Sequence, residues 1–179
     1  MRDLVKNNPF RILGVYADAS IKEITSNKTK LLAYAKVNKQ LEFNSDCTSL
    51  LGAVDRTVAS VTEAERELTL PENKIKYALF WFVNDGPINS VALSNIQEGS
   101  SYNVIKAMDI LLKKPSFGSW INLATLSLIQ GDVENVINCI LRFLTNKSYC
   151  LQFSTAICGD SFKIAPERHH SRSNRGIDQ

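Results

Sequence analysis

Histidine is almost absent from this sequence of 179 residues, and its scarcity excludes much of the chemistry that enzymes use. Both histidines, His169 and His170, lie in a polar stretch near the C-terminal end, so no segment with apolar periodicity carries the commonest general base. The sequence also has no Gly-rich phosphate loop, no G-x-S-x-G and no H-E-x-x-H motif. We therefore expect that the protein is not an enzyme and uses no cofactor.

The cysteines are few and lack the spacing of a metal site. The sequence has four, with no C-x-x-C pair among them: Cys47, Cys139, Cys150 and Cys158. With two adjacent histidines as the only other soft ligands, no zinc constellation is predicted. Cysteines in mostly apolar surroundings without an evident partner are typical of a reducing compartment.

Long apolar runs are also missing. The longest unbroken run, Ala78 to Val83, is far too short to cross a bilayer, so no membrane partner is expected. The first residues contain no apolar core of the kind that signal peptides have, which predicts a cytoplasmic protein. The net charge of +3 is too small to indicate nucleic acid by itself, and the 44% hydrophobic content suits one compact domain or two small ones.

The first half of the chain has local signals of helix starts and stops. Asn8 and Pro9 are typical of an N-cap and a first helical residue, and Gly14 is suited to the stop that follows. Ser20 and Glu23 form an S-x-x-E capping box before a helix that extends to about Gln40. The apolar residues of that helix recur as one stripe: Ile21, Ile24, Leu31, Leu32 and Ala35.

A second long helix is predicted to start near Ser49 and to end before Pro71, which disfavours helical geometry at Leu70. Its apolar residues are Leu51, Val54, Val58, Val61 and Leu68. Because its polar residues are mainly acidic and those of the preceding helix are basic, we expect the two to pack as an antiparallel pair. Pro71 opens a further short helix that is expected to continue through the aromatic cluster to Phe82, and this cluster is expected to close the core.

The order of these elements resembles the J-domain of DnaJ-type co-chaperones over roughly residues 8–83. The resemblance rests on the short segment that ends in "ILGV", on the basic helix with an Ala-Ser start, and on the closing segment "LPENKIKY". J-domains carry His-Pro-Asp in the loop between their two long helices. The corresponding loop here, Lys36 to Thr48, contains neither His nor Pro. The resemblance thus implies a J-domain frame without the tripeptide that stimulates the ATPase of a heat-shock chaperone.

In J-domains the basic helix also binds an acidic surface of that chaperone. Carried over to this sequence, the resemblance implies a partner-binding role for Lys28, Lys30, Lys36 and Lys39. The alternative is that these lysines form only a solvated helix face, partly neutralised by the acidic neighbouring helix.

The second half of the chain repeats part of itself. The motif Leu93 to Gln97 recurs from Leu126 to Gln130, about 33 positions later, and a glycine follows each copy, Gly99 and Gly131. This period resembles tetratricopeptide-type repeats, in which helix pairs stack on one another. An ordinary helical bundle with a coincidental match remains the alternative. If the repeats form a concave face, its polar residues are expected to be Asn95, Asn122 and Gln130.

The expected architecture is therefore all-α, with a J-domain-like helical domain in residues 1–85 and a tetratricopeptide-like helical domain in residues 86–165. Residues 166–179 are predicted to be a disordered tail. The predicted function is a non-enzymatic, co-chaperone-like interaction adaptor that does not stimulate the chaperone ATPase. Its partners are expected to be proteins, a heat-shock ATPase chaperone among them. Whether the chain also forms a homo-oligomer is left open by the sequence. The alternative function is nucleic-acid binding through the basic helix 21–40, against which the acidic neighbouring helix argues.

Overall fold

Helices account for the regular structure of residues 2–159, the part of the chain that the computed structural model describes. No strand occurs in this range, which confirms the expected all-α class. The first half contains α1 (Arg2–Lys6), α2 (Pro9–Ile12), α3 (Ile21–Lys36), the 3-10 turn η1 (Asn44–Asp46), α4 (Thr48–Leu51), α5 (Val58–Glu67) and α6 (Pro71–Ala78). The second half contains α7 (Pro87–Glu98), α8 (Ser101–Lys113), α9 (Phe117–Gln130), α10 (Val133–Leu144) and α11 (Lys147–Cys158).

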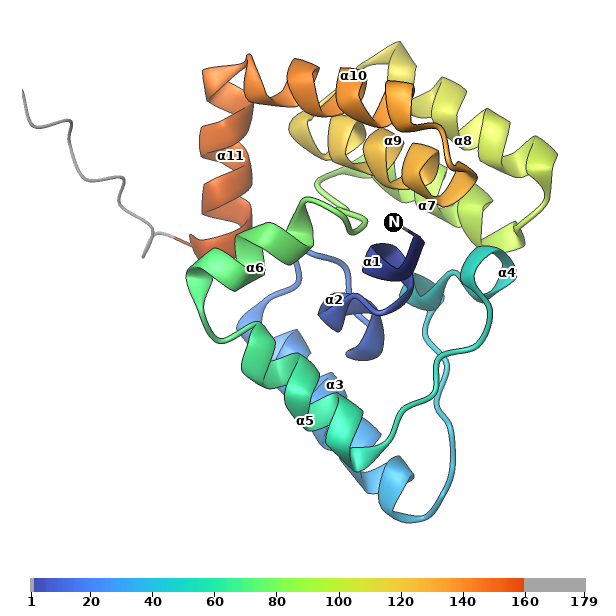
Figure 1. Cartoon of the computed structure of the whole chain (residues 1–179), viewed down its shortest axis with the longest axis vertical. Coiled ribbons are helices and arrows are strands. Elements are labelled where there is room, and N and C mark those ends of the chain that lie inside the picture. Colours follow the sequence, from blue (N-terminus) through green and yellow to red (C-terminus); the bar gives the residue numbers. More distant parts are fainter. Residues whose placement is uncertain (1, 160–179) are drawn as a thin grey trace, which may run out of the picture.

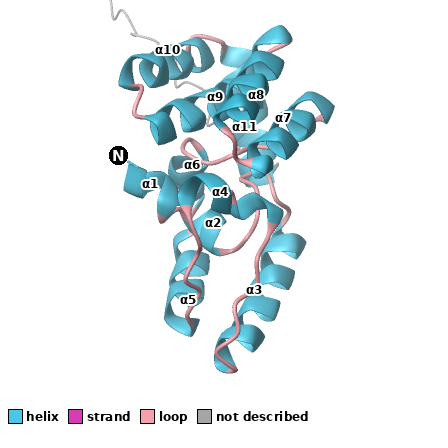
Figure 2. Ribbon diagram, turned by 90° about the vertical axis from the view of Figure 1, so that its right-hand side faces the viewer, coloured by secondary structure: helices cyan, strands magenta, loops and turns pink. Residues whose placement is uncertain are grey.

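The two ends of the molecule differ in construction. The α3/α5 pair projects from one end, and α7 to α10 gather at the other (Figures 1 and 2). Between them lie α1, α2 and α6 (Figures 1 and 2). The predicted tail, residues 166–179, lies outside the described residues.

The two helix starts predicted in the first 25 residues, at Asn8–Pro9 and at Ser20, are confirmed. The Asn8 side chain accepts a hydrogen bond from the Phe10 amide at 3.1 Å, and Pro9 is the first residue of α2. Ser20 accepts one from the Glu23 amide at 3.2 Å. The return bond of the capping box, from the Ser20 amide to the Glu23 carboxylate, is not formed within the described part of the chain.

The second long helix does not start near Ser49, and that prediction was wrong. α4 ends at Leu51, and the chain then stays non-helical until α5 begins at Val58. Gly52 has a φ of 79°, which a helix cannot contain. Thr57 caps α5 instead, through reciprocal bonds with Ser60 at 2.9 and 3.0 Å. The apolar spacing across residues 51–58 continues through a segment that is not helical.

The helices α3 and α5 pack as the expected antiparallel pair, with α2 against α5 (Figure 2). Leu31 of α3 and Val61 of α5 are fully buried. Asn27 lies on the same side of α3 and donates hydrogen bonds to the Leu13 and Gly14 carbonyls. Ile21, by contrast, is 78% exposed, so the predicted apolar stripe of α3 is covered only in its middle part.

The aromatic residues that follow α6 close the core as expected. Trp81 and Phe82 are completely buried, and the Trp81 indole donates to the Val15 carbonyl at 2.8 Å. Asn8 donates to the Tyr77 carbonyl at 2.9 Å, which holds the end of α6 against the start of α2. The segment after Ala78 is not helical, so α6 is shorter than the sequence suggested.

In the second half, α7 packs on α8 and α9 packs on α10, with a left-handed glycine at the end of α7 and of α9. These are Gly99, with a φ of 71°, and Gly131, with a φ of 81°. α9 is the central helix of this half, since most of its residues are buried. α1 packs against α9, and α11 packs against both α6 and α9, so the two predicted domains share one continuous core.

We expect Gly99→Ala to destabilise the protein clearly more than Gly131→Ala. Both positions require left-handed backbone, which costs a residue with a Cβ about 1–2 kcal/mol. A Cβ at Gly99 would also lie 2.1 Å from Cβ of Ser49 in α4, whereas a Cβ at Gly131 would meet nothing within 4 Å. Urea unfolding of both variants separates the backbone cost from the clash. Equal losses would mean that α4 does not pack on the α7–α8 turn.

Candidate functional site

The chain between α3 and α5, residues 37–57, contains η1 and α4 and is otherwise a loop. In this protein it is tied to the interior by a buried ion pair. The Asp46 carboxylate accepts bonds from both terminal nitrogens of Arg56, at 2.5 and 2.9 Å, and a third from the Phe43 amide at 3.0 Å. The two charged side chains are 2% and 1% exposed. The Arg56 guanidinium also lies over the Phe43 ring, 5.2 Å from its centroid.

A second arginine completes this cluster. Arg11 of α2 donates to the carbonyls of Lys6, Asp46 and Gly52 at 2.9, 2.9 and 2.6 Å. Burial lowers the pKa of Arg11, and nearby Asp46 partly opposes that effect. Two guanidinium groups and one carboxylate therefore hold both ends of the loop against α2. We call Arg11, Asp46 and Arg56 the arginine–aspartate cluster.

The middle of the loop is fixed to the second half of the chain. The Ser49 hydroxyl of α4 donates to the Gln97 carbonyl at 3.2 Å and approaches that of Ile96 at 3.5 Å, at the end of α7. Just before it, Cys47 is buried with left-handed backbone, and burial raises the pKa of its thiol to about 12. The loop is thus packed from both sides.

The predicted partner-binding lysines do not form one face. Lys28 is half-buried and pairs with Glu65 of α5 at 2.5 Å, whereas Lys30, Lys36 and Lys39 are exposed. At about 100° per helical residue, Lys30 lies roughly 200° around the axis from Lys28. Lys39 follows α3 in the loop. The structure instead brings Lys30 beside Lys22, on a shallow surface that also contains Thr25, Ser26 and Thr29.

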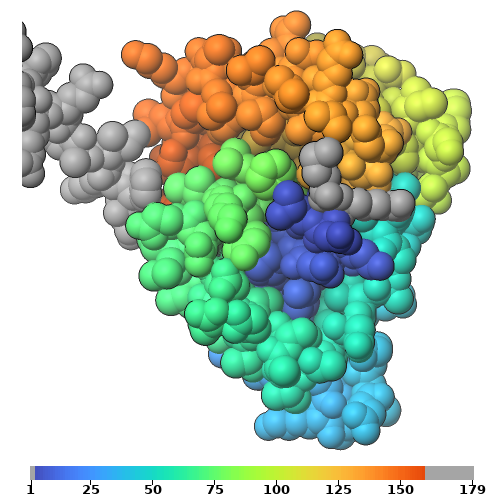
Figure 3. Space-filling model, in the orientation of Figure 1, coloured from blue at the N-terminus to red at the C-terminus, as the bar shows by residue number. Residues whose placement is uncertain are grey.

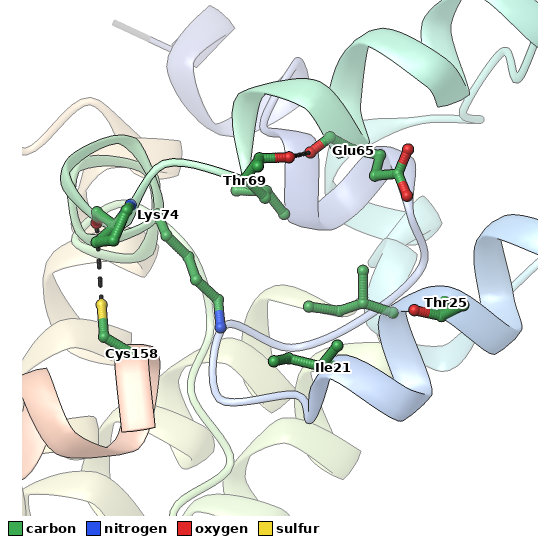
Figure 4. A pocket seen from close by; sticks show the side chains of 9 residues that line it. Ile21, Thr25, Glu65, Thr69, Lys74 and Cys158 are labelled. Atoms are coloured by element: carbon green, nitrogen blue, oxygen red, sulfur yellow. Dashed lines mark hydrogen bonds between the residues drawn. The ribbon is translucent and has the colours of Figure 1, made fainter. Parts of the chain in front are cut away.

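A cavity of about 320 Å³ opens where the α3/α5 pair meets α6 and α11 (Figure 4). Apolar side chains form much of its wall: Ile21, Ile24, Leu68 and Pro71. Lys74 crosses it and donates to the Ile157 carbonyl at the end of α11, where a cation is favoured by the helix dipole. Burial lowers the pKa of Lys74. The cavity can accept an apolar group with a polar end.

The cavity has no paired acid and base. Its carboxylate, Glu65, is engaged by Lys28, and burial raises the pKa of its thiol, Cys158, so that the thiol stays protonated near neutral pH. Cys158 lies 3.9 Å from the Pro71 carbonyl (Figure 4). This arrangement suits binding rather than covalent chemistry.

The amides that were expected on a concave face are placed differently from one another. Gln130 is exposed and Asn95 is half-buried, but Asn122 is completely buried, so its predicted surface role was wrong. It holds the backbone of Val83 between the two halves, through bonds of 2.8 Å to the Val83 amide and carbonyl. A repeat pattern predicts on which face of its helix a residue such as Asn122 lies, but it does not predict whether another part of the chain packs against that face.

Sequence reasoning missed the arginine–aspartate cluster and the cavity. Arg56 is one of the polar positions of the predicted second helix, and nothing in the local spacing links Asp46 to Arg11 or Arg56. Within residues 2–159 no group of histidine, cysteine and acidic side chains could hold a metal ion, and no helix is long and apolar enough to cross a membrane. His169 and His170 lie outside the described residues. Comparison of the chain with models of protein families, with curated proteins and with solved structures finds no match in any of the three.

Proposed function

We propose that this chain is a non-enzymatic, cytoplasmic adaptor that binds other proteins. In this proposal, residues 1–85 form a J-domain-like bundle and residues 86–165 form tetratricopeptide-like hairpins. The observation that carries the proposal is the fixed loop between α3 and α5. Where a J-domain presents His-Pro-Asp, this loop has neither His nor Pro, and the arginine–aspartate cluster and Ser49 bind it to the rest of the protein.

The order of helices in the first half supports the same proposal. A short helix, α2, packs against α5 of an antiparallel pair, and a further short helix, α6, closes the bundle after Pro71. The acidic partner of the basic helix is also in place, since Glu65 pairs with Lys28. This frame is suited to binding through surface side chains without coupling to ATP hydrolysis.

The state of the cysteines supports a non-enzymatic role. Burial raises the pKa values of Cys47, Cys139 and Cys158. A thiol needs to be deprotonated to act as a nucleophile, so these thiols are poor candidates for covalent catalysis near neutral pH.

We expect the purified protein to leave the ATPase rate of a heat-shock chaperone at its background level. The physical reason is that the loop lacks the tripeptide and is held by internal bonds. Single-turnover ATP hydrolysis measures this directly, with a J-domain that has His-Pro-Asp as the positive control. Stimulation comparable to that control would contradict the proposal.

If the chaperone is nevertheless bound, the exposed lysines of α3 and its following loop should contribute. Lys36→Glu and Lys39→Glu are then expected to weaken binding, and binding should fall as salt rises. Lys114→Glu is the matched control, since Lys114 is also exposed but lies after α8. Equal effects of all three variants would indicate non-specific attraction.

Nucleic-acid binding through residues 21–40 is the alternative function. The spread of the lysines around α3, and the pairing of Lys28 with Glu65, give a phosphate backbone no continuous track to follow. A filter-binding assay with a steep salt dependence would favour this alternative over the adaptor.

A further inference from the structure

The Lys74 side chain lies in the cavity between the α3/α5 pair, α6 and α11 without an acidic partner. It points from α6 across the cavity toward Ile21 at the start of α3 (Figure 4). Its ammonium donates to the Ile157 carbonyl, and further N–H donors of the same group remain. Among the described residues it forms no ion pair with a carboxylate. The positive charge of Lys74 is therefore available to a ligand.

A half-buried cation without a counterion is unfavourable, because the protein replaces the water that would solvate it. Burial accordingly lowers the pKa of Lys74, and the nearby Cys158 thiol only partly opposes this effect. The carboxylate that lines the same cavity, Glu65, is already bound by Lys28 at 2.5 Å. An anionic group beside Lys74 would supply the charge that the protein itself does not provide there.

The wall of the cavity indicates what the rest of such a ligand is made of. Ile24 and Leu68 are 9 and 8% exposed, whereas Ile21, on the open side, is 78% exposed. No aromatic ring is among the described residues that line the cavity, so an aliphatic chain is a better match than a stacked ring. A volume of about 320 Å³ lies at the small end of the range for ligand sites.

We propose that this cavity binds a free aliphatic carboxylic acid of medium chain length. Its carboxylate pairs with Lys74, and its chain lies against the apolar wall that Ile24 and Leu68 form. A second negative charge on the ligand would lie close to Glu65 and be repelled by it. A monocarboxylate is therefore a better match than a phosphate ester.

The position of the cavity gives the ligand contacts with both halves of the chain. In the space-filling view α6 and α11 pack directly on each other (Figure 3). The lining residues come from these two helices, from α3 and from the end of α5. Because the cavity lies outside the loop 37–57, this inference goes beyond the proposed adaptor. Its test needs no chaperone, and a failure to bind the acid leaves the ATPase result untouched.

The length of the chain is tested by calorimetric titration of the full-length protein with octanoate and hexanoate near neutral pH. We expect one octanoate per chain, with a dissociation constant below about 1 mM. Each CH2 group that is removed should weaken binding about fourfold, because it is buried against the apolar wall. The absence of saturable octanoate binding up to about 10 mM would overturn the proposal.

The charge of the head group is tested with octan-1-ol and octylammonium, which have the same chain. Both should bind at least about tenfold more weakly than octanoate, since neither forms an ion pair with Lys74. Equal binding of either compound would overturn the role of Lys74. A peptide ending in leucine that competes with octanoate and binds more tightly would show that the cavity takes a protein C-terminus, which overturns the small acid as its ligand.

Lys74→Met tests the location, because it keeps a long apolar side chain and removes the charge. Octanoate should bind at least about tenfold more weakly to this variant, whereas octan-1-ol should bind as it does to the wild type. Lys76→Met is the matched control, since Lys76 is exposed on the same helix and does not line the cavity. Octanoate binding that survives Lys74→Met, or that falls equally in Lys76→Met, would overturn the assignment.

A second variant leaves Lys74 and its bond to Ile157 in place. Ile21→Asp puts a negative charge at the open side of the cavity, and the fold should tolerate it because Ile21 is exposed and is the first residue of α3. It should weaken octanoate binding at least about tenfold. Val58→Asp is its control, since Val58 is an exposed first residue of α5 outside the cavity. With circular dichroism unchanged in both variants, equal octanoate binding by Ile21→Asp and Val58→Asp would overturn the location.

Discussion

Replacing Asp46 by alanine is expected to lower the free energy of unfolding by about 3–5 kcal/mol, the range found when one partner of a buried ion pair is removed. The Asp46 carboxylate is the only acid in contact with the Arg56 guanidinium among the described residues, and both side chains are almost fully buried. Without it, Arg56 keeps its charge but loses its counterion. The loss should be measured by urea unfolding.

The second arginine makes this loss larger. Burial is the main cause of the lowered pKa of Arg11, and the nearby positive charge of Arg56 lowers it further. In the wild type, Asp46 offsets that repulsion. After the substitution two buried cations would remain, with backbone carbonyls and the Phe43 ring as their partners but no counterion among the described residues. We expect the loop 37–57 to detach first, which hydrogen exchange at the Phe43 amide would report, since that amide donates to Asp46.

Two further variants identify the cause. Asp55→Ala removes an exposed acid from the same loop, whose one bond is a 3.4 Å contact with Gln40, and should change stability by less than about 0.5 kcal/mol. Asp46→Asn keeps the size of the side chain and removes its charge. If Asp46→Asn is as stable as the wild type, hydrogen bonding and not charge holds the loop. A loss below about 1 kcal/mol in Asp46→Ala would contradict the buried ion pair altogether.

The sequence predicted those parts of the fold that depend on near neighbours. The starts of α2 and α3 were found because Asn8, Pro9 and Ser20 act on amides within the next three residues. The turns at Gly99 and Gly131 were found because left-handed backbone selects glycine. Each of these signals is local, so the order and class of the elements could be predicted without knowing the tertiary structure.

The parts that were missed depend on contacts distant in sequence. Val54 and Val58 continued an apolar period that suggested one helix, but Arg56 between them turns inward to meet Asp46, Ile12 and Leu41. The burial of that guanidinium outweighs the local preference for helix. The candidate site was missed for a similar reason, since Lys74 and Ile157 meet only when α11 folds back on α6.

Replacing Asn122 by alanine is expected to lower the free energy of unfolding by about 2–6 kcal/mol, and to loosen the connection between the two halves. The side-chain oxygen of Asn122 accepts a hydrogen bond from the Val83 backbone amide at 2.8 Å. Its side-chain nitrogen donates to the Val83 carbonyl at 2.8 Å and to the side-chain oxygen of Asn89 at 2.9 Å. Alanine would leave both backbone groups of the buried Val83 unpaired, at about 1–3 kcal/mol each. Asn95→Ala is the matched control, because the half-buried Asn95 side chain donates to the Val91 carbonyl of its own helix, α7, and should contribute less than about 1 kcal/mol.

The variant Asn122→Asp shows whether Asn122 stabilises the protein through its hydrogen bonds or only by filling space, because Asp has nearly the same shape as Asn. An ionised carboxylate would still accept from the Val83 amide but would face the Val83 carbonyl and the Asn89 side-chain oxygen, which raises its folded-state pKa above the usual value of about 3.9. At a pH below about 3.9, the pKa of the unfolded state, the protonated Asp side chain can donate to the Val83 carbonyl, and the full stabilisation of the folded state is present. The stabilisation is lost as the pH rises through the higher folded-state pKa. Relative to the wild type at each pH, Asn122→Asp should thus be most stable in acid. Urea unfolding across the acidic range tests this, and a difference from the wild type that does not change with pH would mean that Asn122 acts only by filling space.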